Sequence, residues 1–266
     1  MKLYEELTVE ERDEYILDVV GLLLHGNPPV AGEHRLPEWE AGWAEALENE
    51  QPVPRYHGKH KLLRWQQRIV RQLVPGLDYF VHCQIVDWAI RTYLSQKDTI
   101  FDFGCGTADH LRRARLYTKA RLVGLDWTRA SQDITSGIEG IEGRNFDFYE
   151  PDYSLDFPPN SGVLTVSALE QVGERFEPFL QFLLAKRPAI CVHIEPIDEL
   201  MDQDNLIDML SVWYCRKRNY LRGFLTRLRQ LQDQGKVDIH LERRTYTGSY
   251  FIEGHSLVVW SPKGDC

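Results

Sequence analysis

Short apolar runs alternate with segments of helical spacing from residue 99 to the end of the chain, and this alternation restricts the fold more than any other feature. Strands that are separated by helices pair in parallel, so the pattern predicts a parallel sheet with helices on its faces. A turn-like stretch separates the last two runs, which predicts a hairpin closing the edge of the sheet. The runs span residues 99–103, 121–125, 145–148, 162–166, 189–194, 237–243 and 256–260.

Residues 1–95 show a different pattern, which predicts a helical N-terminal extension to a domain that spans residues 96–266. Thr8 and Glu11 form a capping box at the start of a helix that ends at Gly26. Further helices are expected over residues 39–48, 58–73 and 80–94. The second of these would carry four basic side chains on one face, at steps of three and four residues: Lys61, Arg64, Arg68 and Arg71.

The bulk properties exclude several classes of protein. A length of 266 residues suits one α/β domain, and a net charge of −9 argues against general affinity for nucleic acid or anionic membranes. The N-terminus lacks the pattern of a secretory signal, and the apolar runs are far shorter than the roughly 20 residues of a membrane span. The five cysteines contain no Cys-x-x-Cys pair, which gives zinc ribbons little support and fits a reducing compartment. A cytoplasmic location is therefore expected.

The first apolar run ends in a glycine-rich turn, Asp102-Phe103-Gly104-Cys105-Gly106-Thr107-Ala108, before a helix. Glycines let the backbone turn sharply and approach a ligand closely, and the helix start offers unpaired N–H groups. A dinucleotide-binding turn needs a small residue where this chain has Asp109, whose carboxylate would repel a pyrophosphate. Together with Asp102, it favours a cationic ligand. A tight turn that binds nothing is the structural alternative.

This turn resembles the first motif of class I S-adenosylmethionine-dependent methyltransferases, and the resemblance extends over roughly residues 98–200. It implies a Rossmann-like α/β fold with a seven-stranded, mostly parallel sheet whose last strand is antiparallel. It also implies S-adenosyl-L-methionine as the cofactor, with Asp102, Gly104 and Gly106 around its methionine part. Ala108 stands where the family usually has a third glycine.

Residues after the second and third runs complete the expected cofactor site. Asp126 ends the second run, and the resemblance gives it the two ribose hydroxyls; dehydrogenases share such an acid, so it indicates a nucleoside without identifying it. Asp147 and Phe148 resemble the pair that contacts adenine, with Glu150 and Asp152 as nearby alternatives. The predicted cofactor-binding residues are Asp102, Gly104, Cys105, Gly106, Asp126, Trp127, Asp147, Phe148 and Ser167.

Candidate catalytic residues follow the fourth and fifth runs. Residues 167–172 resemble a family segment beside the transferred methyl group, in which Glu170 remains a carboxylate and Gln171 replaces a common histidine. The alternative for Glu170 is a helix N-terminal residue favoured by the dipole. His193 and Glu195 alternate along a strand and therefore share a face, which predicts a general base and its orienting partner. A structural histidine or a metal site are the alternatives, and no metal is among the expected cofactors.

Two cationic segments without acids suggest an anionic acceptor, such as a phosphorylated or nucleotide-linked sugar. They hold Arg55, Lys59, Lys61, Arg64, Arg68 and Arg71, and Arg216, Lys217, Arg218, Arg222, Arg227 and Arg229. The alternative is a pair of solvated helix faces that pair with acids such as Asp198, Asp202 and Asp208. Nucleic acid is a weaker choice, since no known RNA-binding module is present. Further pocket candidates are Tyr56, Tyr246, Tyr250 and His255.

The sequence therefore predicts an S-adenosylmethionine-dependent methyltransferase that acts on an oxygen or nitrogen of a small polar acceptor, anionic or sugar-like. The helical N-terminal extension is expected to cap the donor and to shape the acceptor pocket. The C-terminal segment resembles uncharacterised methyltransferases of bacterial polysaccharide and small-molecule pathways. An NAD-dependent oxidoreductase and a non-catalytic donor-binding regulatory module are the alternatives.

Overall fold

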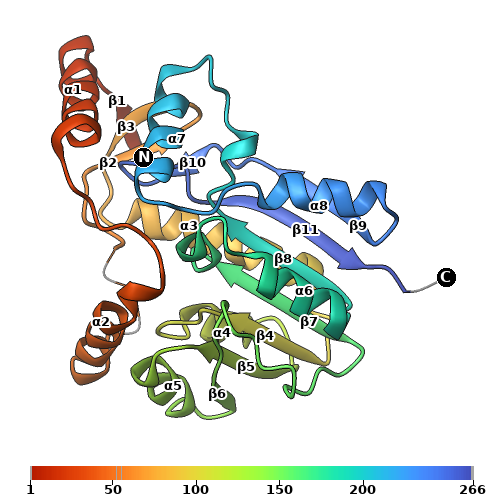
Figure 1. The fold of residues 1–266 in the computed structure, drawn as a ribbon. Helices are drawn as coiled ribbons and strands as arrows, with labels where there is room; N and C mark the ends of the chain where they lie inside the picture. Colours follow the sequence, from red (N-terminus) through yellow and green to blue (C-terminus); the bar gives the residue numbers. More distant parts are fainter. Residues whose placement is uncertain (1, 52, 55, 265–266) are drawn as a thin grey trace.

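The computed structural model describes residues 2–51, 53–54 and 56–264, which form two sheets with helices around the larger one (Figure 1). The larger sheet has seven strands in the order β6-β5-β4-β7-β8-β11-β9. β4 to β8 pair in parallel, and β11 runs antiparallel to both of its neighbours. The strands are β4 (Thr99–Phe103), β5 (Arg121–Asp126), β6 (Ile141–Asn145), β7 (Ser161–Val166), β8 (Ile190–Glu195), β9 (Val237–Arg243) and β11 (Ser256–Pro262). The predicted sheet is confirmed.

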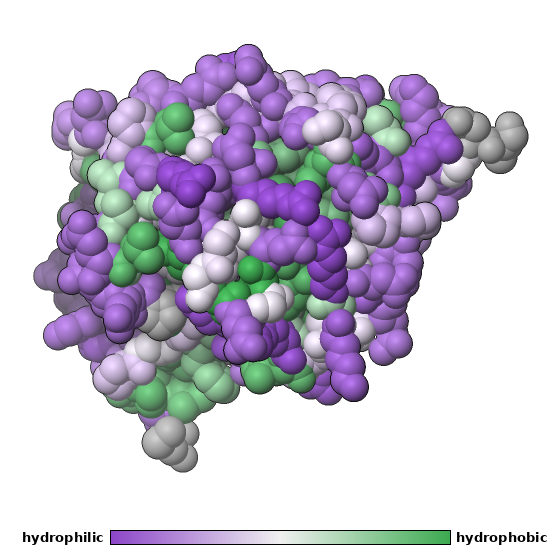
Figure 2. All heavy atoms as spheres, turned by 90° about the horizontal axis from the view of Figure 1, so that it is seen from below, coloured by the Kyte–Doolittle hydropathy of each residue, from purple (hydrophilic) through white to green (hydrophobic). Residues whose placement is uncertain are grey.

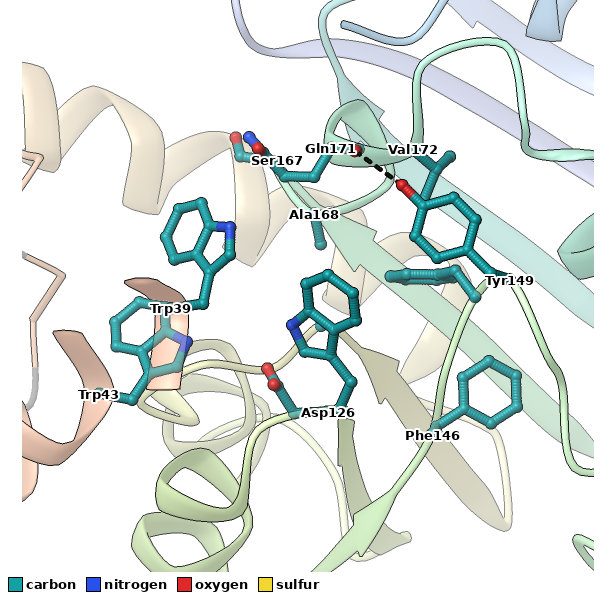
Figure 3. A pocket seen from close by; sticks show the side chains of 12 residues that line it. Trp39, Trp43, Asp126, Phe146, Tyr149, Ser167, Ala168, Gln171 and Val172 are labelled. Atoms are coloured by element: carbon teal, nitrogen blue, oxygen red, sulfur yellow. Dashed lines mark hydrogen bonds between the residues drawn. The ribbon is translucent and has the colours of Figure 1, made fainter. Parts of the chain in front are cut away.

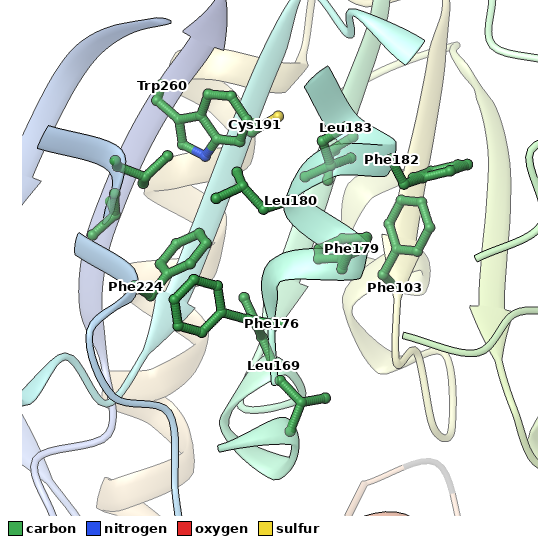
Figure 4. Packing of buried hydrophobic residues seen from close by; sticks show 14 of the residues in the cluster. Phe103, Leu169, Phe176, Phe179, Leu180, Phe182, Leu183, Cys191, Phe224 and Trp260 are labelled. Atoms are coloured by element: carbon green, nitrogen blue, oxygen red, sulfur yellow. The ribbon is translucent and has the colours of Figure 1, made fainter. Parts of the chain in front are cut away.

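Apolar side chains bury both faces of this sheet, which is why its central strands are nearly unbroken apolar runs. On one face, α6 and α8 pack against Phe103, Cys191 and Trp260 (Figure 4). On the other face, α3 and α4 pack against Ile100 and Leu122. The helices are α3 (Leu77–Ala89), α4 (Asp109–Ala114), α5 (Arg129–Ser136), α6 (Glu177–Lys186), α7 (Leu206–Lys217) and α8 (Phe224–Asp233). A π-helical turn, η2 (Ile90–Leu94), follows α3, and the 3-10 turns are η1 (Glu33–Arg35), η3 (Leu169–Val172) and η4 (Asp198–Leu200).

The N-terminal third combines helices with a small antiparallel sheet. α1 (Val9–His25) begins with the predicted capping box, and α2 (Leu36–Glu48) lies close to the predicted short helix. The small sheet has the order β1-β3-β2-β10, so a strand from the C-terminal part completes it. Its strands are β1 (Tyr4–Glu6), β2 (Leu62–Trp65), β3 (Arg68–Gln72) and β10 (Thr247–Gly248).

The helix predicted over residues 58–73 is wrong, because this segment is the β2–β3 hairpin. Gln66 and Gln67 form its turn with φ angles of 49° and 61°, the left-handed conformation that two-residue hairpin turns require. Neither residue is glycine, asparagine or aspartate, so the sequence carried no turn signal. The apolar residues of this segment are buried by the pairing of two strands, in which Leu63 lies opposite Val70.

The hairpin separates the basic residues that a helix would have aligned. Arg64 is buried and donates hydrogen bonds to the Ile207 carbonyl (2.5 Å), the Tyr15 hydroxyl (2.9 Å) and the Phe251 carbonyl (3.0 Å). Arg68 pairs with Glu6 and Arg71 with both Glu5 and Glu11 at 2.6 to 2.8 Å. These arginines therefore stabilise the N-terminal part of the fold rather than presenting free charge, and Arg55 lies outside the described residues.

The third strand of the large sheet is also displaced from its prediction. β6 covers Ile141–Asn145 rather than residues 145–148. As an edge strand it is partly exposed and polar, so it gave no apolar run. The apolar residues after it pack beyond the strand, with the ring of Phe146 4.6 Å from that of Phe103.

The surface is mostly hydrophilic, with apolar residues in small separate groups on the face in Figure 2. Within the described residues, the chain has no helix that combines the length and apolar character needed to cross a membrane.

We predict that Arg64→Ala lowers the free energy of unfolding by about 3 kcal/mol, because two buried carbonyls and a hydroxyl lose their donor. Urea unfolding followed by circular dichroism measures the change. Arg68→Ala, in the same hairpin but with an exposed side chain, is the control and should cost less than about 1 kcal/mol. Equal losses for the two variants would contradict the structural role of Arg64.

Candidate functional site

A cavity of ≈ 570 Å³ opens at the carboxyl ends of β4, β5 and β7, beside the end of β6 (Figure 3). This is the edge at which open α/β sheets bind ligands, where the strand order reverses. In Figure 3, Trp39 and Trp43 of α2 lie across the cavity from Phe146 and Tyr149. The lining residues are Trp39, Trp43, Gly104, Asp126, Trp127, Phe146, Phe148, Tyr149, Ser167, Ala168, Gln171 and Val172.

The turn after β4 requires its two glycines. Gly104 and Gly106 have φ angles of 73° and 52°, in the region that favours glycine. A Cβ on Gly104 would lie 2.4 Å from the Cβ of Ala168, and one on Gly106 would lie 2.9 Å from the Trp43 ring. The backbone of the turn is therefore packed directly against the segment after β7 that holds Ala168, and against α2.

Asp126 joins this turn to the next helix. Its Oδ2 accepts the backbone N–H of Gly106 (3.1 Å), and its Oδ1 accepts the N–H and hydroxyl of Thr128 (2.9 and 2.7 Å). Burial raises the pKa of the carboxyl, and these donors act in the opposite direction. The side chain lines the cavity, as the prediction requires of a ribose-binding acid.

Asp102 is a fully buried carboxylate whose two oxygens have no hydrogen-bond partner. Its nearest cation is His110, with Nδ1 3.6 Å from Oδ2. Burial acts to lower the pKa of His110, but the carboxylates of Asp102 and Asp109 outweigh it and raise the pKa. Buried polar atoms in folded proteins normally have partners, so the charge of Asp102 indicates a binding position for a cationic group.

The remaining predicted cofactor residues divide into two groups. Trp127, Phe148 and Ser167 line the cavity. Cys105 faces away from it, with its thiol 3.4 Å from the Thr135 hydroxyl, so only its backbone belongs to the turn. Asp147 holds the N–H of Tyr149 in a local turn (2.8 Å) and is absent from the cavity lining.

The sequence predicted a cap in the N-terminal extension but did not identify which residues of α2 line the cavity. Trp39 and Trp43 are one helical turn apart, stack with centroids 5.8 Å apart and line the cavity. Two tryptophans at this helical spacing were the available signal. Tyr149 and Gln171 were also missed; the tyrosine hydroxyl donates to the Gln171 carbonyl at 3.3 Å (Figure 3).

Glu170 and Glu195 lie together beside the cavity but have different environments. Glu195 accepts the backbone N–H groups of Ala168, Leu169 and Glu170, each at 3.1 Å, and so holds the start of η3. Glu170 accepts one hydrogen bond from Gln171, and its Oε2 has no partner. Burial and the charge of Glu195 raise the pKa of Glu170 to about 8.

His193 does not fulfil its predicted role as a base. Its ring is fully buried, with Nδ1 2.9 Å from the Thr165 hydroxyl and Nε2 accepting the indole N–H of Trp260 (2.9 Å). Burial also lowers the pKa of His193 to about 3. Both ring nitrogens therefore form hydrogen bonds within the core. This is the structural histidine that the sequence analysis gave as an alternative.

The other pocket candidates lie apart from the lining residues. The Tyr250 hydroxyl donates to Asp18 (2.8 Å), and Tyr246 packs beneath Arg244. The His255 ring lies 5.0 Å from that of His82. Tyr56 is exposed, and its ring lies 4.5 Å from that of His57.

The second cationic segment is largely neutralised. Arg222, Arg227 and Arg229 pair with Glu174, Glu177 and Glu242, respectively. Lys217 donates to the Leu23 carbonyl (2.9 Å), and Arg218 to the Tyr214 hydroxyl (2.9 Å). The acids that pair with the three arginines are not the aspartates expected from the sequence. The segment is therefore mainly structural.

Solved methyltransferase structures share this fold. Human N-acetylserotonin methyltransferase in complex with SAM matches 97% of this chain and 68% of its own, with a TM-score of 0.55 and 16% identity. The N-methyltransferase NodS from Bradyrhizobium japonicum WM9, in complex with S-adenosyl-L-homocysteine, matches 84% of this chain and 100% of its own, with a TM-score of 0.53 and 10% identity. No family model and no curated protein matches the sequence. At these identities the likeness establishes the fold, which is that of class I methyltransferases.

We predict that Glu170 makes stability depend on pH. Its folded-state pKa lies above the ordinary value of 4.5, so its contribution is present below pH 4.5 and is lost as the pH rises through about 8. Between pH 5 and 8.5 the wild type should lose about 3 kcal/mol more stability than Glu170→Gln. Urea unfolding at both pH values measures this, and equal losses in the two proteins would contradict it.

Proposed function

We propose that this chain is an S-adenosylmethionine-dependent methyltransferase that transfers a methyl group to an oxygen or nitrogen of a small polar acceptor. The observation that carries the proposal is the fully buried carboxylate of Asp102 beside the glycine turn, whose oxygens accept no hydrogen bond and whose ion-pair partner is His110 at 3.6 Å. A ligand with both an ammonium and a sulfonium group compensates this charge. The two structural relatives with the same fold hold SAM or S-adenosyl-L-homocysteine, which supports the choice of cofactor.

Asp102 is buried and is not among the residues that line the cavity, but the lining residues fit the rest of such a nucleoside. Asp126 lies on the cavity wall, one strand away from Asp102, where a carboxylate suits ribose hydroxyls. Trp127, Phe148 and Tyr149 supply flat apolar surfaces for a purine.

An NAD-dependent oxidoreductase fits the turn less well. A pyrophosphate at this turn would approach two buried carboxylates, Asp102 and Asp109. Asp109 stands at the first position of α4 and accepts the Tyr79 hydroxyl (2.8 Å), so it is fixed at the helix start where a phosphate would bind. The negative charges of these two carboxylates would repel a diphosphate bound at the turn.

The charges beside the cavity favour a neutral or amine acceptor over an anionic one. The arginines that suggested an anionic acceptor are mostly paired with acids or with carbonyls. The buried Oε2 of Glu170, in contrast, has no partner. A sugar-like acceptor remains compatible when it presents hydroxyl or amino groups in place of a phosphate.

In such a transfer, the residues of this chain mainly align the acceptor and accept its proton. When bound, the donor supplies a methyl group on a positively charged sulfur, so that the sulfur–carbon bond breaks as the bond to the acceptor oxygen or nitrogen forms. Alignment of the acceptor supplies much of the rate. We assign to Glu170, whose Oε2 has no partner, the role of orienting the acceptor and, once ionised, of receiving its proton.

We predict that Asp102→Asn weakens binding of S-adenosyl-L-homocysteine at least tenfold, because the ammonium group of the ligand loses the buried carboxylate that compensates its charge. Calorimetric titration measures the affinity, and urea unfolding checks that the variant is folded. Asp238→Asn, a surface acid paired with Lys263, is the control and should change neither. Tight binding of NAD by the wild type, with no response to S-adenosyl-L-homocysteine, would overturn the proposed function.

We predict that Glu170→Gln lowers kcat at least tenfold and leaves the Kd of S-adenosyl-L-homocysteine within twofold, because the side chain acts on the acceptor. Turnover is measured as S-adenosyl-L-homocysteine formation with panels of amino sugars, other small amines, hydroxyl compounds and sugar phosphates. Glu174→Gln, an exposed acid four residues further on, is the control. Donor binding without turnover on any panel would favour the non-catalytic module.

A further inference from the structure

α2 covers the part of the cavity that a ligand must reach. The Trp43 ring packs against the backbone of Gly106, so closely that a Cβ there would lie 2.9 Å from the ring. Asp102, two residues before the first glycine, is fully buried and both of its oxygens are shielded from solvent. An ammonium group cannot reach this carboxylate from solvent unless a covering element moves.

The contacts that hold α2 are mainly polar. Ala46 is the one buried residue within the helix, and none of its described residues belongs to the buried apolar clusters. Elements without apolar anchoring open at low free-energy cost compared with the core. In contrast, the neighbouring α3 contributes Val86 and Ala89 to the main core.

Glu40 holds α2 to the start of α5. Its carboxylate accepts the backbone N–H groups of Arg129 (2.7 Å) and Ala130 (3.0 Å), the first two residues of α5. Thr128, the N-cap residue, makes no side-chain capping bond to α5 because its hydroxyl donates to Asp126. The cap of α5 is therefore supplied by a different helix, and a negative charge at this position is favoured by the helix dipole.

A second contact holds the other end of α2. Arg35, immediately before the helix, donates to the Gln171 side chain at 3.3 Å and stacks over the Trp39 ring at 4.9 Å. α2 is thus joined to α5 on one side of the cavity and to η3 on the other. The hydrogen bond of Glu40 to Arg129 is exposed, whereas Arg35 is buried.

We propose that α2 is a lid over the donor pocket and that Glu40 is the positioning residue that holds it closed. Release of Glu40 from α5 lifts Trp43 off Gly106 and opens a path to Asp102. Return of the carboxylate places Trp39 and Trp43 back against the cavity and slows the departure of the donor. The identity of the ligand as the methyl donor rests on the proposed function.

The test uses the full chain and S-adenosyl-L-homocysteine as the probe. We expect Glu40→Ala to raise the dissociation rate about tenfold, equal to about 1.4 kcal/mol, as followed by stopped-flow tryptophan fluorescence. KM for S-adenosylmethionine should rise with kcat unchanged, and Glu40→Gln, which keeps one acceptor oxygen, should lie between alanine and the wild type. Glu48→Ala, an exposed acid on the same helix, should have no effect.

Amide hydrogen exchange separates this proposal from the proposed function, because it needs no ligand. In the free wild type, α2 should exchange faster than α3, and Glu40→Ala should raise the α2 rate about tenfold without affecting β4 or β5. An α2 as protected as α3, with no effect of Glu40→Ala, would overturn the lid even if the nucleoside binds. Failure of the wild type to bind S-adenosyl-L-homocysteine would instead overturn the proposed donor, and the exchange rates would still decide on the lid.

Discussion

The hydrogen bonds of the Asp126 carboxylate keep the parts of the candidate site in register. One oxygen holds Gly106 of the turn after β4, and the other holds Thr128 at the start of α5. Glu40 of α2 in turn caps α5, so a continuous series of hydrogen bonds connects the central strands to the N-terminal helix α2. A carboxylate with three N–H and O–H donors is rigid, so the spacing between turn, helix and lid is set by a few atoms.

Buried carboxylates recur around this centre, and their different environments divide their roles. The Glu195 carboxylate accepts hydrogen bonds from three backbone N–H groups and so fixes the conformation of the loop after β7. Asp102 and Glu170 keep oxygens without partners, which is costly in a folded protein unless a ligand compensates the charge. The arginines of the two basic segments do not compensate these buried carboxylates, because most of them pair with acids on the surface.

The sequence was sufficient for the features that local chemistry determines. β4, β5, β7 and β8 lie within one or two residues of their predicted positions because strands buried on both faces are mostly apolar. The glycine turn and Asp126 could be placed because their geometry demands particular residues. β6 and the β2–β3 hairpin could not: an edge strand needs no apolar run, and the hairpin turn uses Gln66 and Gln67 in a conformation those residues rarely adopt. The role of His193 could not be predicted either. Strand alternation shows which face of the sheet a residue lies on, but it does not show its hydrogen-bond partners, which here are Thr165 and Trp260.

The pairing of β10 with β2 has a consequence for how the chain acquires its structure. β10 and the Phe251 carbonyl that accepts from Arg64 lie far from β2 in the sequence, with 187 positions between Arg64 and Phe251. Until this later segment joins, the β2 edge is open and Arg64 lacks one of its three acceptors. Contacts of such wide sequence separation fold slowly. The small sheet is thus completed late in folding, and a chain truncated before residue 247 would expose the β2 edge to aggregation.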